Sequence, residues 1–307
     1  MSEVSHNKPK ALVLLAAYNG VKWIYEQVES ILKQEKVDVS IIISVDKSDD
    51  GTENLVSRIA EQHKNVTVLP YGDVYGGAAR NFFRLFKEAD FSCFDYVSLS
   101  DQDDIWHPGK LSRAIQKLIY MPADAYSGNV VAFWCDGRRQ LIDKAQNQKR
   151  FDYFFEAAGP GCTYVFTKEI AVKFQFFLRT TLSADSIILH DWLLYAFVRS
   201  QGYVWFIDSE PYMDYRQHNR NQVGVNKSLL SLYRRAKYVL FGGGIEQIKK
   251  LIDVLPSNDQ FIKFNLSCRR DVLFLLLQSN ELRRRPIERF YVFIVLFITL
   301  ITGAKEK

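Results

Sequence analysis

The sequence contains few cysteines, no internal repeat and no apolar leader at its start. Four cysteines occur among 307 residues, with no C-x-x-C pair, so no disulfide framework is expected and free thiols in a reducing cytosol are indicated. The absence of a 20-to-50-residue repeat or a low-complexity tract argues against a solenoid. The first ten residues, MSEVSHNKPK, lack an apolar segment, and we therefore expect no secretory signal.

The chain also lacks a strong excess of one charge. Its formal net charge is +5, and 48% of its residues are hydrophobic, which is enough for one large core or two smaller ones. The mild basic bias suits an acidic partner without choosing among nucleic acid, phosphates and anionic lipid. Basic residues concentrate beside apolar segments rather than among exposed aromatics, so we expect no nucleic-acid partner.

Over the first third of the chain, segments with the hydrophobic pattern of strands alternate with segments that have the hydrophobic spacing of helices. Apolar runs predict strands, and helical spacing separates them. The segments KSDDGT and GGAARN mark helix starts, with Thr52 expected to cap the first of these helices. The expected strands are 11–19, 39–46, 65–70 and 94–101, and the expected helices are 21–32, 53–63 and 76–89. This order predicts an α/β fold with a mostly parallel sheet and helices on both faces.

The alternation of predicted strands and helices is less regular beyond residue 120. From about residue 225 the sequence is helical, basic and apolar. We expect a boundary there, which divides the chain into a catalytic region, 1–225, and a helical region, 226–307. The further expected strands are 130–136, 162–168 and 203–208, and the further expected helices are 168–179 and 191–202.

An uncharged apolar segment lies near the end of the sequence. Residues 290–304 form a stretch of 15 residues, whereas a straight bilayer span needs ~20 apolar residues. With its basic flanks, the segment suits a monotopic anchor on an anionic membrane surface, and a buried terminal helix is the alternative. The flanking basic residues are Arg283, Arg284, Arg285, Arg289, Lys305 and Lys307.

Polar residues gather where the predicted strands end. Ligands of an open parallel sheet bind beyond the carboxyl ends of its strands. Tyr18, Asp46 and Asp101 follow three of these strands, and Arg80 falls in the first turn of the helix that opens at Gly76. A helix start with small residues and a nearby arginine suits a phosphate. We therefore expect a nucleotide cleft at this edge.

The segment SDQDDIW crowds acids directly after a buried strand. If residues 100–104 remain extended, Asp101 and Asp103 point to the same side. Two carboxylates on one side suit Mg²⁺ or Mn²⁺. An acidic turn that caps the helix near Pro108 explains the same residues equally well.

Two later segments carry candidate chemistry. Asp191 is either an N-cap or a general base in a cleft walled by Trp192. Arg216 and His218 follow in the segment YRQH, where the histidine is either a loop residue or a metal ligand.

These segments, in this order, resemble family 2 glycosyltransferases with the GT-A fold. The motifs are AAYNG, SVDKSDDGT, GGAARN, SDQDDIW, GPGCTYVF, HDW and YRQH, over roughly residues 10–225. Within the family, the chain is most similar to the bacterial rhamnosyltransferase-like branch. One departure is Lys47, where many relatives have a second acid after the one at Asp46.

The resemblance implies a role for each matching residue. Asp46 would contact the nucleotide base with Ala17 and Tyr18, and Asp101 would lie by the ribose or the metal. Asp103, in the D-x-D motif, would bind the Mg²⁺ or Mn²⁺ that bridges the diphosphate. The remaining assignments are Asp191 as catalytic base, His218 in the metal site, and Gly161, Cys162, Thr163, Trp192 and Arg216 around the acceptor and donor sugar.

The implied function is inverting sugar transfer in bacterial surface polysaccharide or O-antigen synthesis. The donor would be a dTDP- or UDP-sugar, with rhamnose as the first expectation and galactose or galactofuranose as alternatives. The acceptor would be a glycan or a polyprenyl-linked oligosaccharide at the cytoplasmic face of the cell membrane. The retained acids argue against a non-catalytic nucleotide-sugar or lipid-binding module, and a glycosidase would need no nucleotide cleft.

Overall fold

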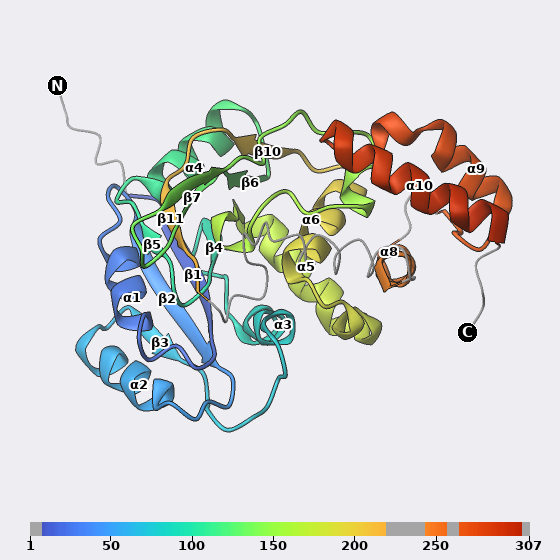
Figure 1. The fold of residues 1–307 in the computed structure, drawn as a ribbon. Helices are drawn as coiled ribbons and strands as arrows, with labels where there is room; N and C mark the ends of the chain where they lie inside the picture. The colour runs from blue at the N-terminus through green and yellow to red at the C-terminus, as the bar shows by residue number, and fades with distance from the viewer. Residues whose placement is uncertain (1–7, 219–242, 257–263, 303–307) are drawn as a thin grey trace.

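A central mixed sheet organises the molecule. The computed structural model describes residues 8–218, 243–256 and 264–302 (Figure 1). Within them the larger sheet has the strand order β10-β6-β9-β4-β1-β2-β3. Its strands are β1 (Lys10–Ala17), β2 (Asp38–Val45), β3 (Val66–Val68), β4 (Tyr96–Ser100), β6 (Ala125–Gly128), β9 (Val165–Thr167) and β10 (Trp205–Asp208). Only β9 runs antiparallel to its neighbours β4 and β6, so this sheet is mostly parallel, as predicted.

The sheet is covered on both faces at β1, which is apolar and buried from residue 11 to residue 17. Leu12 and Leu14 belong to one buried cluster, whereas Val13 and Leu15 belong to the other. Alternate residues of a strand point to opposite faces, so a continuous apolar run fits a strand between two layers. The first cluster includes residues of α3 (Ala78–Glu88), α5 (Lys168–Thr180) and α6 (His190–Ser200); the second includes residues of α1 (Ile24–Leu32), α2 (Thr52–Gln62) and α4 (Lys110–Tyr120).

A smaller sheet lies beside the parallel one, with the strand order β5-β11-β7-β8. Its strands are β5 (Ile105–Trp106), β7 (Val130–Phe133), β8 (Arg139–Ile142) and β11 (Met213–Arg216). The antiparallel pairing of β11 with β5 brings the segment before His218 next to the acidic turn after β4. This smaller sheet therefore joins two motifs that lie more than a hundred residues apart.

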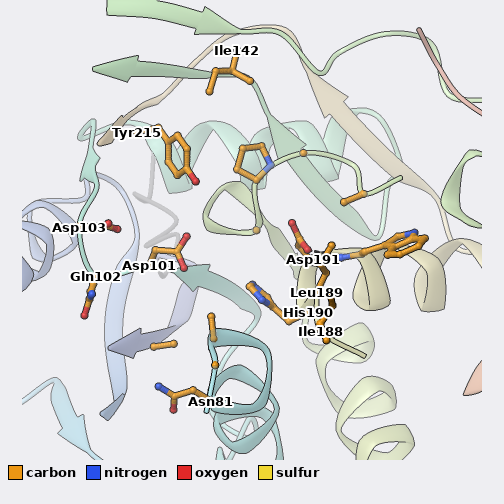
Figure 2. A pocket seen from close by; sticks show the side chains of 18 of the residues that line it. Asn81, Asp101, Gln102, Asp103, Ile142, Ile188, Leu189, His190, Asp191 and Tyr215 are labelled. Atoms are coloured by element: carbon orange, nitrogen blue, oxygen red, sulfur yellow. Dashed lines mark hydrogen bonds between the residues drawn. The ribbon is translucent and has the colours of Figure 1, made fainter. Parts of the chain in front are cut away.

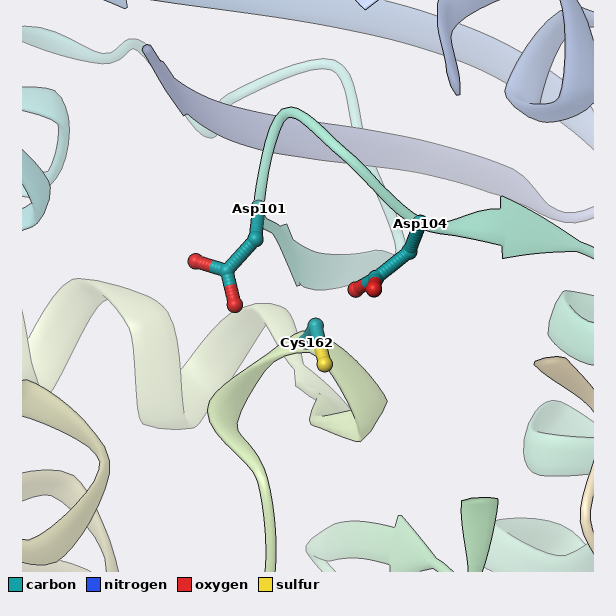
Figure 3. Close-up of side chains that lie close together, drawn as sticks. All are labelled: Asp101, Asp104 and Cys162. Carbon is teal, nitrogen blue, oxygen red and sulfur yellow. The ribbon is translucent and has the colours of Figure 1, made fainter. Parts of the chain in front are cut away.

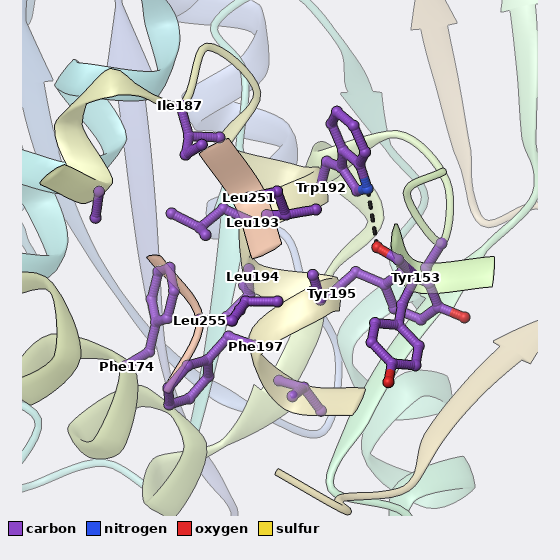
Figure 4. Packing of buried hydrophobic residues seen from close by; sticks show 14 of the residues in the cluster. Tyr153, Phe174, Ile187, Trp192, Leu193, Leu194, Tyr195, Phe197, Leu251 and Leu255 are labelled. Atoms are coloured by element: carbon purple, nitrogen blue, oxygen red, sulfur yellow. Dashed lines mark hydrogen bonds between the residues drawn. The ribbon is translucent and has the colours of Figure 1, made fainter. Parts of the chain in front are cut away.

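The described C-terminal helices pack on the same core as α6. They are α8 (Gly243–Val254), α9 (Arg269–Leu277) and α10 (Pro286–Thr302). Leu251 and Leu255 share a buried cluster with Trp192 and Phe197 (Figure 4). The boundary expected near residue 225 lies outside the described residues and stays a prediction.

The apolar C-terminal segment forms α10, a helix of 17 residues. No helix among the described residues combines the length and the apolar character that crossing a membrane requires. Val295 and Leu296 are buried, whereas much of the helix surface is exposed and apolar.

One predicted capping residue is wrong. Gly51, with φ of 86°, is the N-cap of α2, and Thr52 is its first helical residue. The buried hydroxyl of Thr52 accepts a hydrogen bond from the Gly20 amide at 2.8 Å and donates one to Asp50. Thr52 thus ties the start of α2 to the loop after β1, because Gly51 takes the left-handed turn that precedes the helix.

Candidate functional site

A cleft of about 1450 Å³ opens at the carboxyl ends of β1, β2 and β4 (Figure 2). Two walls face each other across it. The strand-end wall contains residues 16–19, 46–47, 76–78 and 101–103, and the loop wall contains residues 140–144, 155–157, 159–161, 188–192, 283, 285 and 288. The first wall follows from the sheet, while the second is assembled from four separate segments.

Gln102 joins two strand ends in the strand-end wall. Its side-chain Oε1 accepts the Tyr18 amide at 2.8 Å, and its Nε2 donates to the Tyr18 carbonyl at 2.7 Å. A Cβ on Gly20 would lie 2.1 Å from Oε1 of Gln102, so a larger residue there would displace the Gln102 side chain from these hydrogen bonds. Gln102 was not predicted as a site residue, although it occupies the middle of the D-x-D motif.

Asp46 is buried and holds the loop that precedes α3. Its carboxylate accepts hydrogen bonds from the amides of Lys47 and Tyr75, both at 2.8 Å, and from that of Gly76 at 3.0 Å. Asp46 lines the cleft as predicted for a nucleotide-binding residue. Its hydrogen bonds place Gly76 and Gly77 at the cleft surface, where neither residue has a side chain that narrows the cleft.

Residues 101–104 form a bend rather than an extended strand. The expectation that Asp101 and Asp103 point the same way from an extended segment is therefore wrong. Instead Asp101 converges with Asp104 and Cys162, whose potential ligand atoms all lie within 4.8 Å of one another (Figure 3). Burial, followed by repulsion from Asp103 and Asp191, raises the pKa of Asp101, so the local field favours a cation near these acids.

Asp103 pairs with His218. Asp103 Oδ2 lies 2.6 Å from His218 Nε2, and the imidazole stacks on Trp23 with ring centroids 4.2 Å apart. Trp23 also lines the cleft but was not predicted, since a single tryptophan in a helix-start sequence carries no signal of its own. The pair offers a carboxylate oxygen and an imidazole nitrogen at the cleft surface.

Arg216 lies behind this pair rather than in the cleft wall. Its amide donates to Asp104 Oδ1 at 3.1 Å, and its Nε donates to the Asp103 carbonyl at 2.8 Å. Its guanidinium also contacts Glu26 at 2.5 Å. Arg216 therefore fixes the acidic turn from outside.

A buried lysine supplies positive charge to the same turn. Lys110 is 3% exposed, and its ammonium lies 3.4 Å from the centre of the Trp106 ring. Burial lowers the pKa of Lys110 to about 7, while attraction to Cys162 and Asp104 opposes that change. Part of the charge of the crowded acids is thus balanced within the protein.

Asp191 projects from the first turn of α6 into the cleft (Figure 2). Leu189 is the N-cap of this helix, so the interpretation of Asp191 as an N-cap is wrong. Burial raises the pKa of Asp191 to about 6, and hydrogen bonds from the amides of Trp192 and of Asp191 itself oppose the change. The carboxylate is therefore mainly ionised at neutral pH and can accept a proton.

The loop wall brings glycine and tryptophan against Asp191. A Cβ on Gly161 would lie 2.7 Å from His190 Nε2 and 3.2 Å from the Asp191 Cβ, so glycine allows this close approach. Trp192 donates its indole N–H to the Tyr153 carbonyl at 2.9 Å (Figure 4). These contacts fix the start of α6 against the segment 151–161.

Buried ion pairs connect the loop wall to the C-terminal helices. The Arg284 side chain is fully buried, and its guanidinium lies 3.0 Å from Glu156 and 3.9 Å from Asp152. The Arg284 amide also donates to Glu156 at 2.7 Å. This contact places Arg283, Arg285 and Glu288 at the cleft surface, and the spacing of the sequence gave no signal for it.

Most predicted site residues meet at the cleft, and four do not. Those that line it are Ala17, Tyr18, Asp46, Asp101, Asp103, Gly161, Asp191, Trp192 and His218. Arg80 is exposed, with its Nε 3.5 Å from the Asp185 carbonyl, because Ala78 and Asn81 occupy the cleft side of α3. Cys162 and Thr163 lie beneath Gly161 in the short helix η2 (Gly161–Thr163), and Arg216 lies behind the acidic turn.

A mostly parallel sheet with acids at its strand ends, facing a carboxylate across one cleft, defines a nucleotide-dependent α/β enzyme. Residues 12–171 match the profile of glycosyl transferase family 2. The dTDP-rhamnosyl transferase RfbG of Shigella flexneri is 42% identical over 289 residues, which cover 93% of this chain and 100% of that protein. The chain belongs to glycosyl transferase family 2 and is a nucleotide-sugar glycosyltransferase.

Solved structures show the same fold. A crystal structure of Staphylococcus aureus TarS, residues 1–349, has a TM-score of 0.56 at 14% identity and covers 97% of this chain and 93% of that one. The mannosyltransferase PcManGT from Pyrobaculum calidifontis, solved with GDP-Man and Mn²⁺, has a TM-score of 0.50 at 16% identity, with coverages of 96% and 88%. The predicted GT-A architecture is therefore confirmed.

Proposed function

We propose that this enzyme transfers rhamnose from a dTDP donor, with inversion, to a hydroxyl group of a glycan or lipid-linked oligosaccharide in bacterial surface polysaccharide synthesis. The similarity to RfbG carries this proposal, because it extends over the whole of that protein. The cleft supports it with a nucleotide-side wall and a carboxylate opposite. Galactose or galactofuranose from a UDP donor is the alternative.

The strand-end wall would hold the donor nucleotide. Ala17, Tyr18 and Asp46, which line the cleft, would contact the base, and Asp101 would contact the ribose or the metal. The Gly77 amide precedes the N-terminus of α3, where backbone N–H groups and the helix dipole favour phosphate, while the Gly76 amide donates to Asp46. Lys47 adds positive charge to this wall.

The donor set at Asp103 and His218 fits Mg²⁺ or Mn²⁺. A carboxylate oxygen and an imidazole nitrogen are ligands that Mn²⁺ accepts, and carboxylate oxygen alone suits Mg²⁺. A divalent ion bound there would stabilise the negative charge of the departing diphosphate. Asp103 and His218 would hold it, and Asp101 would share it.

Asp191 would act as the general base. It lies across the cleft from the acidic turn, so a sugar bound between them would present opposite faces to leaving group and acceptor (Figure 2). Asp191 would take the proton from the acceptor hydroxyl as that oxygen attacks the anomeric carbon. Attack opposite the leaving diphosphate inverts the configuration.

The exposed apolar side chains of α10 support peripheral binding to the cytoplasmic face of the cell membrane. These side chains are Ile287, Phe290, Tyr291, Phe293, Phe297, Ile298 and Ile301. We expect wild-type protein to sediment with vesicles of phosphatidylethanolamine and phosphatidylglycerol, and a Phe290→Ser, Phe297→Ser, Ile301→Ser triple variant to remain unbound. Equal sedimentation of the two proteins would contradict membrane binding through α10.

A donor panel tests the proposed activity. Purified enzyme is incubated with Mg²⁺ or Mn²⁺ and with dTDP-rhamnose, UDP-galactose or UDP-galactofuranose, and nucleotide diphosphate release is measured with and without membrane lipid extract. We expect release from dTDP-rhamnose that rises when the extract is added. Faster release from a UDP-sugar would replace rhamnose with the alternative, and binding without release from any donor would indicate a non-catalytic module.

A further inference from the structure

Lys144 brings an unpaired positive charge into the cleft. Its side chain is half-buried and lines the cleft together with Asp191. The Lys144 amide donates to Asn129 Oδ1 at 2.6 Å. Among the residues that the structure describes, its ammonium makes neither a hydrogen bond nor an ion pair. A half-buried ammonium without a partner loses hydration without compensation, which favours an anionic ligand.

Two acids whose charges act on Lys144 are already engaged by arginines. Glu156 accepts hydrogen bonds from the Arg284 guanidinium and amide at 3.0 Å and 2.7 Å. Glu288 accepts from the Arg283 guanidinium at 3.0 Å and 2.8 Å. Each of these two acids therefore has an arginine partner, and the Lys144 ammonium, whose charge also acts on Asp191, remains available to bind another group.

Lys144 lies on the loop wall, opposite the acids of the strand-end wall. Arg285 lines the same wall and donates to the Asp143 carbonyl. The donor diphosphate has a place of its own at the Asp103–His218 pair and the start of α3. An anion bound at Lys144 would thus belong to the molecule that approaches Asp191 from the acceptor side.

We propose that Lys144, with Arg285 beside it, binds an anionic group of the acceptor and so orients the hydroxyl that Asp191 deprotonates. The inference rests on the proposed function for the identity of the two walls. Two acceptors share the required chemistry: a lipid-linked diphosphate and a saccharide with a carboxylate. In both, Lys144 acts as a positioning residue through charge-assisted hydrogen bonds.

Binding of small probes tests the proposal on the full chain. Saturating dTDP and Mg²⁺ first occupy the strand-end wall, and calorimetry then measures the affinity for citronellyl diphosphate and for glucuronate. We expect wild-type protein to bind one of them, and Lys144→Met to bind it about tenfold more weakly, the effect of losing one charged hydrogen bond. Lys144→Arg should recover most of the affinity. Lys64→Met, an exposed lysine outside the cleft, serves as the matched control.

The possible outcomes distinguish between the two types of acceptor and show whether the proposal fails. Preference for citronellyl diphosphate assigns the site to a lipid-linked diphosphate, and preference for glucuronate assigns it to an acidic saccharide. The proposal fails if Lys144→Met binds the probes as wild-type protein does, or if wild-type protein binds neither. It also fails if Lys144→Met weakens dTDP binding instead, because Lys144 would then serve the donor. Failure of wild-type protein to bind dTDP with Mg²⁺ would contradict the proposed function itself.

Discussion

The two walls of the cleft are built in different ways. The strand-end wall is held by hydrogen bonds between neighbouring strand ends, such as those of Gln102 with Tyr18 and of Asp46 with the loop before α3. The loop wall is held by a buried arginine, Arg284, that enters from the segment before α10. The first wall therefore depends on the sheet, and the second depends on charge pairs between distant segments.

This difference separates two requirements of a transferase. The sheet holds the strand-end wall in register, which suits recognition of a nucleotide diphosphate that all donors share. Loop segments change with little cost to the core, which suits recognition of an acceptor that varies between enzymes. Asp191 lies on the loop wall but must act on a sugar held from the strand-end wall, so activity depends on both.

The largest expected effect comes from Asp191→Asn, which tests whether chemistry resides on the loop wall. The amide oxygen can still accept the Trp192 N–H, now 2.8 Å from Asp191 Oδ1, so the helix start should be retained. Loss of a general base typically lowers turnover by ~10² to 10⁴-fold. We expect kcat to fall by this factor while the affinity for dTDP with Mg²⁺, measured by calorimetry, stays unchanged.

Retention of more than a tenth of the wild-type kcat in Asp191→Asn would show that another group takes the proton. His190 is a poor substitute, since burial lowers its pKa to about 3. A parallel loss of dTDP affinity would mean that Asp191 serves the strand-end wall as well, and the distinction between the walls would fail.

The second effect concerns stability and tests whether Arg284 holds the loop wall. Arg284→Met removes the guanidinium 3.0 Å from the buried Glu156 and leaves that of Arg283, 3.9 Å away, and breaking a buried pair in this way costs about 3–5 kcal/mol. We expect the free energy of unfolding, measured by urea denaturation, to fall by about this amount. Wild-type stability in Arg284→Met would show that other contacts hold the segment.

A double variant separates charge from packing at this site. Glu156→Gln in the Arg284→Met background removes the uncompensated charge but retains an oxygen that can accept the amide of residue 284, as Glu156 does now at 2.7 Å. We expect it to recover a large part of the lost stability. If the double variant is less stable than Arg284→Met, the loss reflects packing and not charge.

The third effect tests the strand-end wall through its metal site. His218→Ala leaves Asp103 in place but removes the imidazole nitrogen 2.6 Å from its carboxylate. We expect the Mn²⁺ concentration for half-maximal activity to rise about tenfold, since one of the proposed ligands is lost. Trp23→Leu, which removes only the ring that stacks on His218, should change it less. An unchanged Mn²⁺ requirement in His218→Ala would assign the ion to other residues.

The sequence predicted the strand-end wall far better than the loop wall, for a physical reason. The sequence of β1 is a continuous apolar run after its first residue, and those of β2 and β4 are apolar runs interrupted by serines. The polar ends of these strands must meet at one edge of a parallel sheet. No comparable rule predicts which loop segments come together to form the loop wall. The positive charges of Lys144 and Arg285 and their separation of about 140 residues do not show that their segments share a surface. That contact depends on the pairing of Arg284 with Glu156, which forms only in the folded chain.

The acidic turn shows a limit of the same kind within the strand-end wall. Asp101 and Asp103 line the cleft as predicted, but the backbone between them is bent and not extended. The amide of Arg216 and the pairing of β11 with β5 pull Asp104 inward and leave Asp103 facing His218. A long-range strand pairing thus causes Asp101 and Asp104 to converge, and the spacing of residues within the acidic turn does not predict that pairing.

The smallest expected effect is on pH dependence and connects Asp191 to its neighbour Lys144. Burial raises the pKa of Asp191 to about 6 from its usual 3.8. A base works in its ionised form, so kcat should be constant at neutral pH and decline as the pH falls through about 6. A decline that begins only near 3.8 would mean that Asp191 is solvated in the working enzyme.

Lys144→Met should move this decline to higher pH. The Lys144 charge favours the ionised form of Asp191 and lowers its pKa, so its removal makes the carboxylate easier to protonate. The direction of the shift is diagnostic, because a lysine that only binds acceptor would change KM and leave the pH of the decline unaltered. The exposed Lys64→Met control should leave both unaltered. An unchanged pH of the decline in Lys144→Met would place the ammonium too far from Asp191 to act on it, and the loop wall would then hold a base and a cation that work independently.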